Sequence, residues 1–169
     1  IPLTLVGMFI LLYATFGKFR QAGLVLSIVP LALFGGMLAL NVRGMTLNVS
    51  SAVGFIAMFG LSIQNGIIMV SQINGLRIKG MELRKSVIEG ARQRFRPILM
   101  TSVTTILGLF PASLATGIGS DVQRPLATVI VYGLMFSTLV SMFLLPAFYY
   151  LVENNVLNKK KNDEKEYTL

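Results

Sequence analysis

Two amides and two hydroxyls lie within long uncharged apolar stretches of the sequence, where their hydrogen-bonding groups could line a hydrated path. Gln64 and Asn65 stand near the middle of residues 48–76, and Thr101 and Thr105 share one helical face at i, i+4 in the next stretch. Polar side chains inside a bilayer are costly, so they either join helices by hydrogen bonds or line a hydrated path. We select these four residues as a candidate transport path and leave both interpretations open. Hydroxyls in such helices also commonly bond back to the carbonyl four residues earlier.

The residue types that carry most enzyme chemistry are missing. The 169 residues include no cysteine and no histidine, which excludes disulfides, thiolate metal sites and the commonest zinc ligand. No acidic pair lies within reach of a common pocket, and no glycine-rich phosphate loop with its lysine occurs. The nine methionines are spread without a repeated pairing, which favours packing over soft-metal ligation. We predict no catalytic residue, no metal ligand and no cofactor.

The elements that must position these residues are predicted to be membrane helices. Apolar residues make up 54% of the chain and charged residues 13%, and the mean hydropathy is +0.72, a balance typical of segments surrounded by lipid. We therefore predict an all-α membrane protein with a bundle over residues 1–153 and a charged cytoplasmic tail at 154–169. Because the chain opens without an initiator methionine and with a short first stretch, we expect a fragment. The predicted spans are residues 1–17, 21–42, 48–76, 97–116 and 125–152.

A sixth helix is expected between the third and fourth spans, over about residues 80–96. Its apolar residues recur every four positions from Leu83 to Phe95, while charged residues fall on another face. This spacing predicts an amphipathic helix on the cytoplasmic leaflet, with membrane lipid as its partner. A solvated charged loop is the alternative. Pro97 is well placed to begin the next membrane helix, because the first turn does not need its missing N–H.

The distribution of Lys and Arg predicts the orientation. Alternating the five spans places thirteen of the fifteen basic residues on one side, including the expected anchors Arg94 and Arg96. The other side receives only Arg43 and the anchor Arg124. Under the positive-inside rule the N-terminus is then outside and the C-terminus is cytoplasmic. The net charge of +8 is explained in this way, and no basic patch interleaved with aromatic residues indicates nucleic-acid binding.

Five motifs carry a resemblance to a known family, in matching order and spacing. In this sequence they read VPLALFGG, FGLSIQNG, RFRPILMTS, TGIGSDVQRPLA and LPAFY, at residues 29–36, 59–66, 94–102, 116–127 and 145–149. With these motifs, about four fifths of the chain closely resembles the second membrane half of the resistance-nodulation-division efflux pumps. The resemblance implies transmembrane helices 8 to 12 of a twelve-helix bundle.

The branch of the family is indicated by residue 64. Multidrug members place a lysine where this sequence has Gln64, and heavy-metal members lack that lysine. The run from Gln64 to Gly66 and the run 121–127 resemble the cobalt, zinc and cadmium branch. Copper and silver members usually have a glutamate in place of Gln64 and a lysine in place of Ile98, and neither is present here.

The resemblance implies a secondary active transporter rather than an enzyme: a proton-driven heavy-metal cation antiporter of the bacterial inner membrane. It places Gln64 and Asn65 where the proton-relay network crosses the bundle, with Thr101 as the hydroxyl member and the relay aspartates in the missing half. It also implies a homotrimer with a periplasmic adaptor and an outer-membrane channel, and a periplasmic N-terminus for this fragment. Two alternatives stay open, a multidrug exporter of the same family and a non-transporting membrane scaffold.

Overall fold

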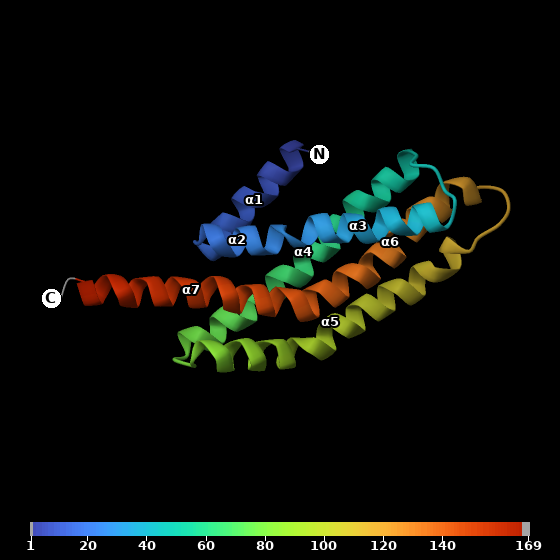
Figure 1. The fold of residues 1–169 in the computed structure, drawn as a ribbon. Coiled ribbons are helices and arrows are strands. Elements are labelled where there is room, and N and C mark those ends of the chain that lie inside the picture. The colour runs from blue at the N-terminus through green and yellow to red at the C-terminus, as the bar shows by residue number, and fades with distance from the viewer. Residues whose placement is uncertain (1, 167–169) are drawn as a thin grey trace.

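The long uncharged stretches of the sequence form long helices, as their composition predicts. The computed structural model describes the backbone of residues 2–166 and the side chains of residue 3 and residues 6–158. Figure 1 shows the helices as one elongated bundle, with α1 lying to one side of it. In chain order the elements are α1 (Pro2–Phe16), α2 (Phe19–Leu26), α3 (Ile28–Val42), α4 (Val49–Ile78), α5 (Leu83–Ser113), α6 (Ser120–Leu139), a π-helical turn (Val140–Leu144) and α7 (Leu145–Glu166).

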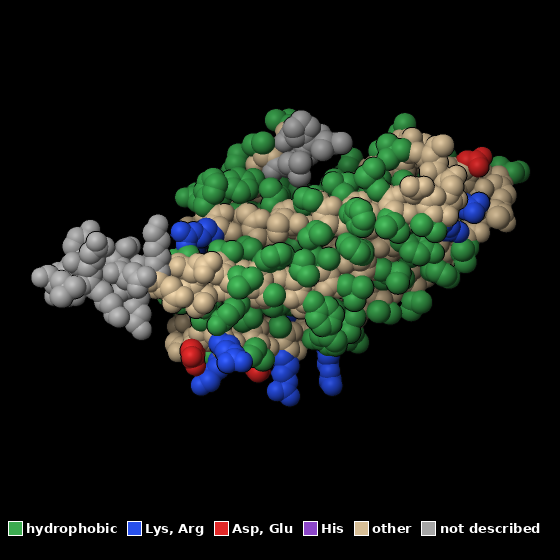
Figure 2. Space-filling model, in the orientation of Figure 1, with side chains coloured by type: hydrophobic (Ala, Val, Ile, Leu, Met, Phe, Trp, Pro, Cys, Tyr) green, Lys and Arg blue, Asp and Glu red, His purple; other side chains and the backbone are tan. Residues whose placement is uncertain are grey.

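Four helical stretches are long and apolar enough to cross a membrane, namely Phe19–Val42, Val49–Ile78, Leu83–Ser113 and Ser120–Asn158. The first predicted span corresponds to α1, which has 15 residues and is shorter than the roughly 20 that a bilayer requires. Hydrophobic side chains cover the middle of the surface in Figure 2, and the charged side chains in view lie mainly toward its two ends. The prediction of an all-α membrane protein is confirmed.

The segment around Pro97 differs from the two separate helices expected from the sequence, because α5 runs through it without a break. Proline removes one helical hydrogen bond and crowds the carbonyl four residues earlier, which bends a helix without having to end it. Figure 1 shows α5 changing direction along its length. Its first part packs on α4, since Val87 is buried and a methyl group added at Gly90 would lie 2.8 Å from Ile73 Cγ1. The placement of residues 80–96 on a membrane surface stays a prediction.

The last membrane stretch is longer than the predicted span of 125–152. α6 continues through the π-helical turn directly into α7. Pro146 accounts for this turn, because it has no N–H to donate and its ring would crowd the carbonyl of Met142 in a regular α-helix. α7 extends as a helix into the residues predicted to be a charged tail. The tail lysines in that prediction lie outside the residues whose side chains are described.

The centre of the bundle is α6, which packs against α3, α4 and α5. Two glycines permit its closest approach to α4. A methyl group added at Gly54 would lie 2.9 Å from the carbonyl oxygen of Leu126, and one added at Gly133 would lie 1.9 Å from Met58 Sδ. Small residues at these crossings let the backbones of α4 and α6 come close together. This packing fixes the position of α6, beside which the polar residues of α4 and α5 lie.

Candidate transport path

The four residues selected from the sequence line one small cavity between α4 and α5. Gln64 and Asn65 come from α4, Thr101 and Thr105 come from α5, and Leu134 of α6 completes the lining with Leu61, Ile68 and Ser102. The cavity volume is about 50 Å³. The structure therefore brings together residues that are about 40 positions apart in the sequence.

Local features of α4 set the rotation of its two amides. Asn48 caps the helix, because its side chain accepts a hydrogen bond from Ser51 N (2.9 Å) and Ser51 Oγ returns one to its carbonyl (2.8 Å). One residue after Asn65, Gly66 faces the α2–α3 segment closely enough that an added methyl group would lie 2.8 Å from Ile28 Cδ1. That contact turns the opposite face of α4, with Gln64, away from α3. Gln64 is exposed and Asn65 is buried.

The threonine hydroxyls donate their protons within their own helix. Thr101 Oγ1 lies 3.1 Å from the Pro97 carbonyl and 3.0 Å from the Ile98 carbonyl, and Thr105 Oγ1 donates to the Thr101 carbonyl at 2.9 Å. This is the back-bonding pattern that the sequence analysis considered. Each hydroxyl oxygen keeps acceptor capacity toward the cavity, because a hydroxyl accepts through two lone pairs.

Water fits the space between the amides and the hydroxyls. A bound water needs roughly 10–15 Å³ of such volume and two to four polar partners, and this cavity supplies both the volume and the partners. Within the described residues, serine and threonine side chains make the hydrogen bonds that join helices beside the cavity. Among these residues, the amides of Gln64 and Asn65 make no such bond there. The amides therefore keep their hydrogen-bonding groups available to the cavity, and their role in a transport path stays a prediction.

A second layer of hydroxyls adjoins the cavity, and it was not predicted from the sequence. Ser137 Oγ donates to Ser62 Oγ at 2.7 Å, which joins α6 to α4. Thr138 Oγ1 and Ser102 Oγ lie 2.8 Å apart and join α6 to α5. All four side chains are buried. Their signal in the sequence is weak, because a single serine in a membrane helix is common and its partner depends on the packing of the helices.

A buried amide cluster near the turn at residues 79–82 was also missed. Asn74 Nδ2 donates to Gln21 Oε1 at 2.7 Å, Gln21 Nε2 donates to Asn74 Oδ1 at 3.0 Å, and Tyr149 donates its hydroxyl to Asn74 Oδ1 at 2.6 Å. Gln21 is 1% exposed and Tyr149 is 0% exposed. Buried amides require partners, and here each partner comes from a different helix, so the cluster joins α2, α4 and α7.

An ion pair continues this cluster toward the end of the bundle. Arg77 of α4 donates a hydrogen bond to the Glu153 carboxylate of α7, and Lys18 Nζ lies 3.9 Å from the same carboxylate. The side chains of Arg77 and Glu153 are 23% and 13% exposed. We call the six side chains from Lys18 to Glu153 the α2–α4–α7 clamp; its members are Lys18, Gln21, Asn74, Arg77, Tyr149 and Glu153.

The predicted anchor residues occupy both ends of the bundle. Arg94 donates from Nε and Nη2 to Gln72 Oε1, at 3.1 and 2.8 Å, and so ties α5 to α4. Arg96 is exposed near the same end. Arg124 lines a pocket with Asp121 at the opposite end, and its buried Nε has no hydrogen-bond partner among the described residues. Their role as membrane anchors stays a prediction.

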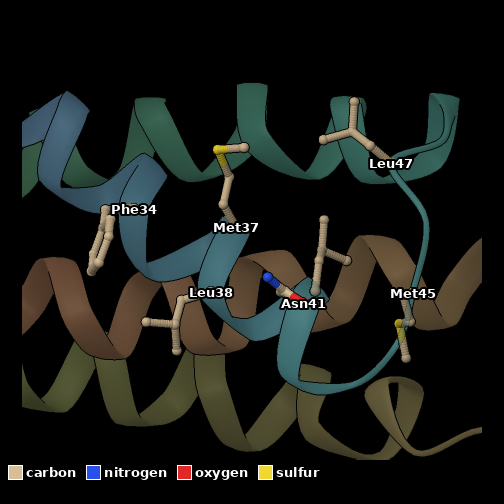
Figure 3. Close-up of a pocket in the computed structure, with 7 residues that line it drawn as sticks. Phe34, Met37, Leu38, Asn41, Met45 and Leu47 are labelled. Carbon is tan, nitrogen blue, oxygen red and sulfur yellow. The ribbon is translucent and has the colours of Figure 1, made fainter.

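The methionines do not converge on a metal site in the pocket of Figure 3. This pocket, of about 500 Å³, lies along α3 and the loop that follows it, and its lining includes Met37 and Met45. Figure 3 shows the two thioethers on different elements and pointing away from each other. Within residues 6–158, no group of three or more acidic side chains is placed to hold a metal ion.

Comparison with known proteins decides the family. Residues 1–153 match the AcrB/AcrD/AcrF family. The chain belongs to this family. Protein HelA of Legionella pneumophila, a relative, is 46% identical over 98% of this chain. The cobalt-zinc-cadmium resistance protein CzcA of Cupriavidus metallidurans is 44% identical over 89% of it.

The solved structure of a heavy metal efflux pump (crystal form II) matches this member of the AcrB/AcrD/AcrF family with a TM-score of 0.83, at 53% identity over 90% of the chain. These comparisons confirm the resemblance to the resistance-nodulation-division family, and the similar proteins include a cobalt-zinc-cadmium resistance protein and a heavy metal efflux pump. The chain spans 16% of HelA, 14% of CzcA and 15% of the solved pump chain. Its helices and its relatives identify a multi-pass protein of the bacterial inner membrane from a family of transporters.

Proposed function

We propose that this chain supplies part of the membrane bundle of a proton-driven heavy-metal cation antiporter. The observation that carries the proposal is the cavity in which Gln64 and Asn65 of α4 face Thr101 and Thr105 of α5. The printed names of two matches, a cobalt-zinc-cadmium resistance protein and a heavy metal efflux pump, support cations as the exported substrate. The complete protein would act as a homotrimer with a periplasmic adaptor and an outer-membrane channel, as the family resemblance implies.

The role of the cavity follows from the chemistry of its side chains. Amides and hydroxyls donate and accept hydrogen bonds at constant charge, so they can orient water but cannot store a proton. Proton-coupled transport also needs a group that changes charge inside the membrane. We assign that step to carboxylates elsewhere in the protein, and we assign to Gln64, Asn65 and Thr101 the alignment of water along the path.

Removing hydrogen-bonding capacity from the cavity should slow export. In the full-length protein we expect Gln64→Leu, Asn65→Leu and Thr101→Val each to lower metal export about tenfold, because about 1.4 kcal/mol of lost hydrogen bonding in the rate-limiting step has that effect. Growth of the producing strain in graded zinc, cobalt and cadmium measures the loss, and immunoblots of membranes verify insertion.

Thr104→Val is the matched control for this experiment. Thr104 lies on the same helix, is exposed, and bonds to the Met100 carbonyl at 2.8 Å without lining the cavity. Wild-type resistance in all three cavity variants would refute the relay role. Loss of resistance to dyes and detergents, with metal resistance unchanged, would instead indicate a multidrug exporter.

The orientation of the bundle is a separate proposal, with the turn at residues 79–82 in the cytoplasm. This chain has no cysteine, so single cysteines can be placed at the exposed positions Lys79 and Ile118 after any cysteines in the rest of the protein are replaced. We expect a membrane-impermeant maleimide to label Ile118→Cys in intact spheroplasts, and Lys79→Cys only after permeabilisation. The opposite labelling pattern would overturn the orientation.

A further inference from the structure

An apolar groove runs along the surface between α3 and α6. Residues at helical spacing line it from each side: Gly35, Leu38, Ala39 and Val42 from α3, and Tyr132, Met135, Phe136 and Leu139 from α6. Its volume is about 410 Å³. Seven residues of helix separate Gly35 from Val42, so the groove is about 10 Å long.

The two ends of the groove differ in chemistry. At one end α3 and α6 touch, because a methyl group added at Gly35 would lie 2.6 Å from Phe136 Cβ. At the other end the guanidinium of Arg43 is held in place, since Nη1 donates to the Ser113 carbonyl at 2.8 Å and to Thr128 Oγ1 at 3.1 Å. The groove therefore has a closed apolar end and a cationic end.

Arg43 retains donors for a ligand. A guanidinium carries five N–H donors in a planar fork that matches phosphate oxygens, and the contacts to Ser113 and Thr128 use only Nη1. Arg43 is also one of two basic residues on the side where the positive-inside rule disfavours them. The positive-inside rule therefore does not account for this arginine, and the donors that it does not use on Ser113 and Thr128 are available to an anion at the mouth of the groove.

The walls of the groove suit a hydrocarbon chain. The apolar side chains that line the groove remain accessible at the surface: Leu38 is 51% exposed, Val42 78%, Met135 47% and Leu139 57%. A phospholipid has an anionic phosphate above an apolar chain, and these two parts match the cationic end and the apolar walls.

We propose that this groove binds a phospholipid of the leaflet on the Arg43 side, with its phosphate on the Arg43 guanidinium and part of one acyl chain between α3 and α6. The site is separate from the cavity of Gln64 and Thr101, which lies between α4 and α5. The proposal depends on the placement of the chain in the membrane and not on its transport activity, so its failure and the failure of the metal-antiport proposal are distinguishable.

Native mass spectrometry of the full-length protein tests the site with phosphatidylglycerol as the probe. We expect one phosphatidylglycerol per protomer to survive activation that strips other lipids, and diacylglycerol with the same chains not to survive. Arg43→Gln should weaken retention about tenfold or more, as loss of a charge-assisted hydrogen bond does. Leu38→Trp should lower retention by filling the groove. Because this variant keeps Arg43, it also tests the site if Arg43→Gln fails to fold.

Two exposed positions away from the groove are the matched controls. Lys79→Gln removes a charge at the other end of the bundle, and Ile56→Trp adds the same ring on α4; both should retain the lipid as the wild type does. Wild-type retention in Arg43→Gln and Leu38→Trp would overturn the site. Crosslinks from groove residues to a second copy or to another segment of the protein, in place of an acyl-chain photoprobe, would also overturn it.

Discussion

Gly54→Leu should prevent the membrane bundle from assembling stably. A side chain at this position would have to enter the contact between α4 and α6, where an added methyl group already lies 2.9 Å from the Leu126 carbonyl oxygen and 3.2 Å from Val129 Cβ. The nearest atom belongs to the backbone, which no rotamer change can move away. Overpacking in such contacts costs about 1–3 kcal/mol and occasionally more, and α6 is the helix against which α3, α4 and α5 pack.

Gly75→Leu is the matched control on the same helix, because no atom of the described residues outside the local helix lies within 4 Å of a methyl group added there. Leucine is also a better helix former than glycine, so we expect this variant to be as stable as the wild type. The measurement is the fraction of purified full-length protein that stays monodisperse after heating. Equal thermal stability of the two variants would contradict the close packing of α4 on α6.

Reversing either charge of the Arg77–Glu153 pair should destabilise the protein, and reversing both should restore much of the loss. Arg77→Glu places two carboxylates side by side, and Glu153→Arg places a guanidinium against Arg77 and near Lys18. Because the pair is mostly but not fully buried, we expect each single reversal to cost about 1–3 kcal/mol, between the ranges for exposed and buried pairs. Recovery in the double variant should be incomplete, since Lys18 then faces an arginine.

The control for these reversals is an exposed pair on the same bundle. Lys85 and Glu82 lie 3.6 Å apart at i, i+3, with side chains 75% and 69% exposed, and exposed pairs contribute little to stability. Their single reversals should leave the unfolding transition in denaturing detergent unchanged. If the Arg77/Glu153 double reversal unfolds as early as the worse single variant, the direct ion pair is not the source of the stability.

Much of the helical architecture could be predicted because hydropathy is a property of each segment by itself. The prediction around Pro97 differed from the structure for a physical reason. A proline that begins a helix and a proline that bends a continuous helix have the same local sequence pattern. Packing on α4, including the contact of Gly90 with Ile73, accompanies the continuation of α5 through this bend. No pattern within the segment contains that information.

Four residues that line the cavity could be selected from the sequence, whereas the α2–α4–α7 clamp could not be predicted. Gln64 and Thr101 stood out because polar residues inside uncharged stretches are few and because they fall in family motifs. Gln21 and Tyr149 lie at the ends of their stretches, where polar residues are ordinary, and they are 128 positions apart. Their meeting depends on how α2, α4 and α7 are rotated and aligned, which the three-dimensional packing determines.

The π-helical turn at Val140–Leu144 governs this alignment for the last helix. At about 100° per residue, the twelve residues from Ser137 to Tyr149 would leave their side chains about 120° apart around a regular α-helix. One extra residue taken up by the wider turn reduces that difference to about 20°. The azimuth of α7 is thereby changed relative to that of α6: Ser137, before the turn, bonds to Ser62, and Tyr149, after the turn, bonds to Asn74, both on α4. The one extra residue in the π-helical turn thus sets how far the clamp residue on α7 is rotated from the hydroxyl layer on α6.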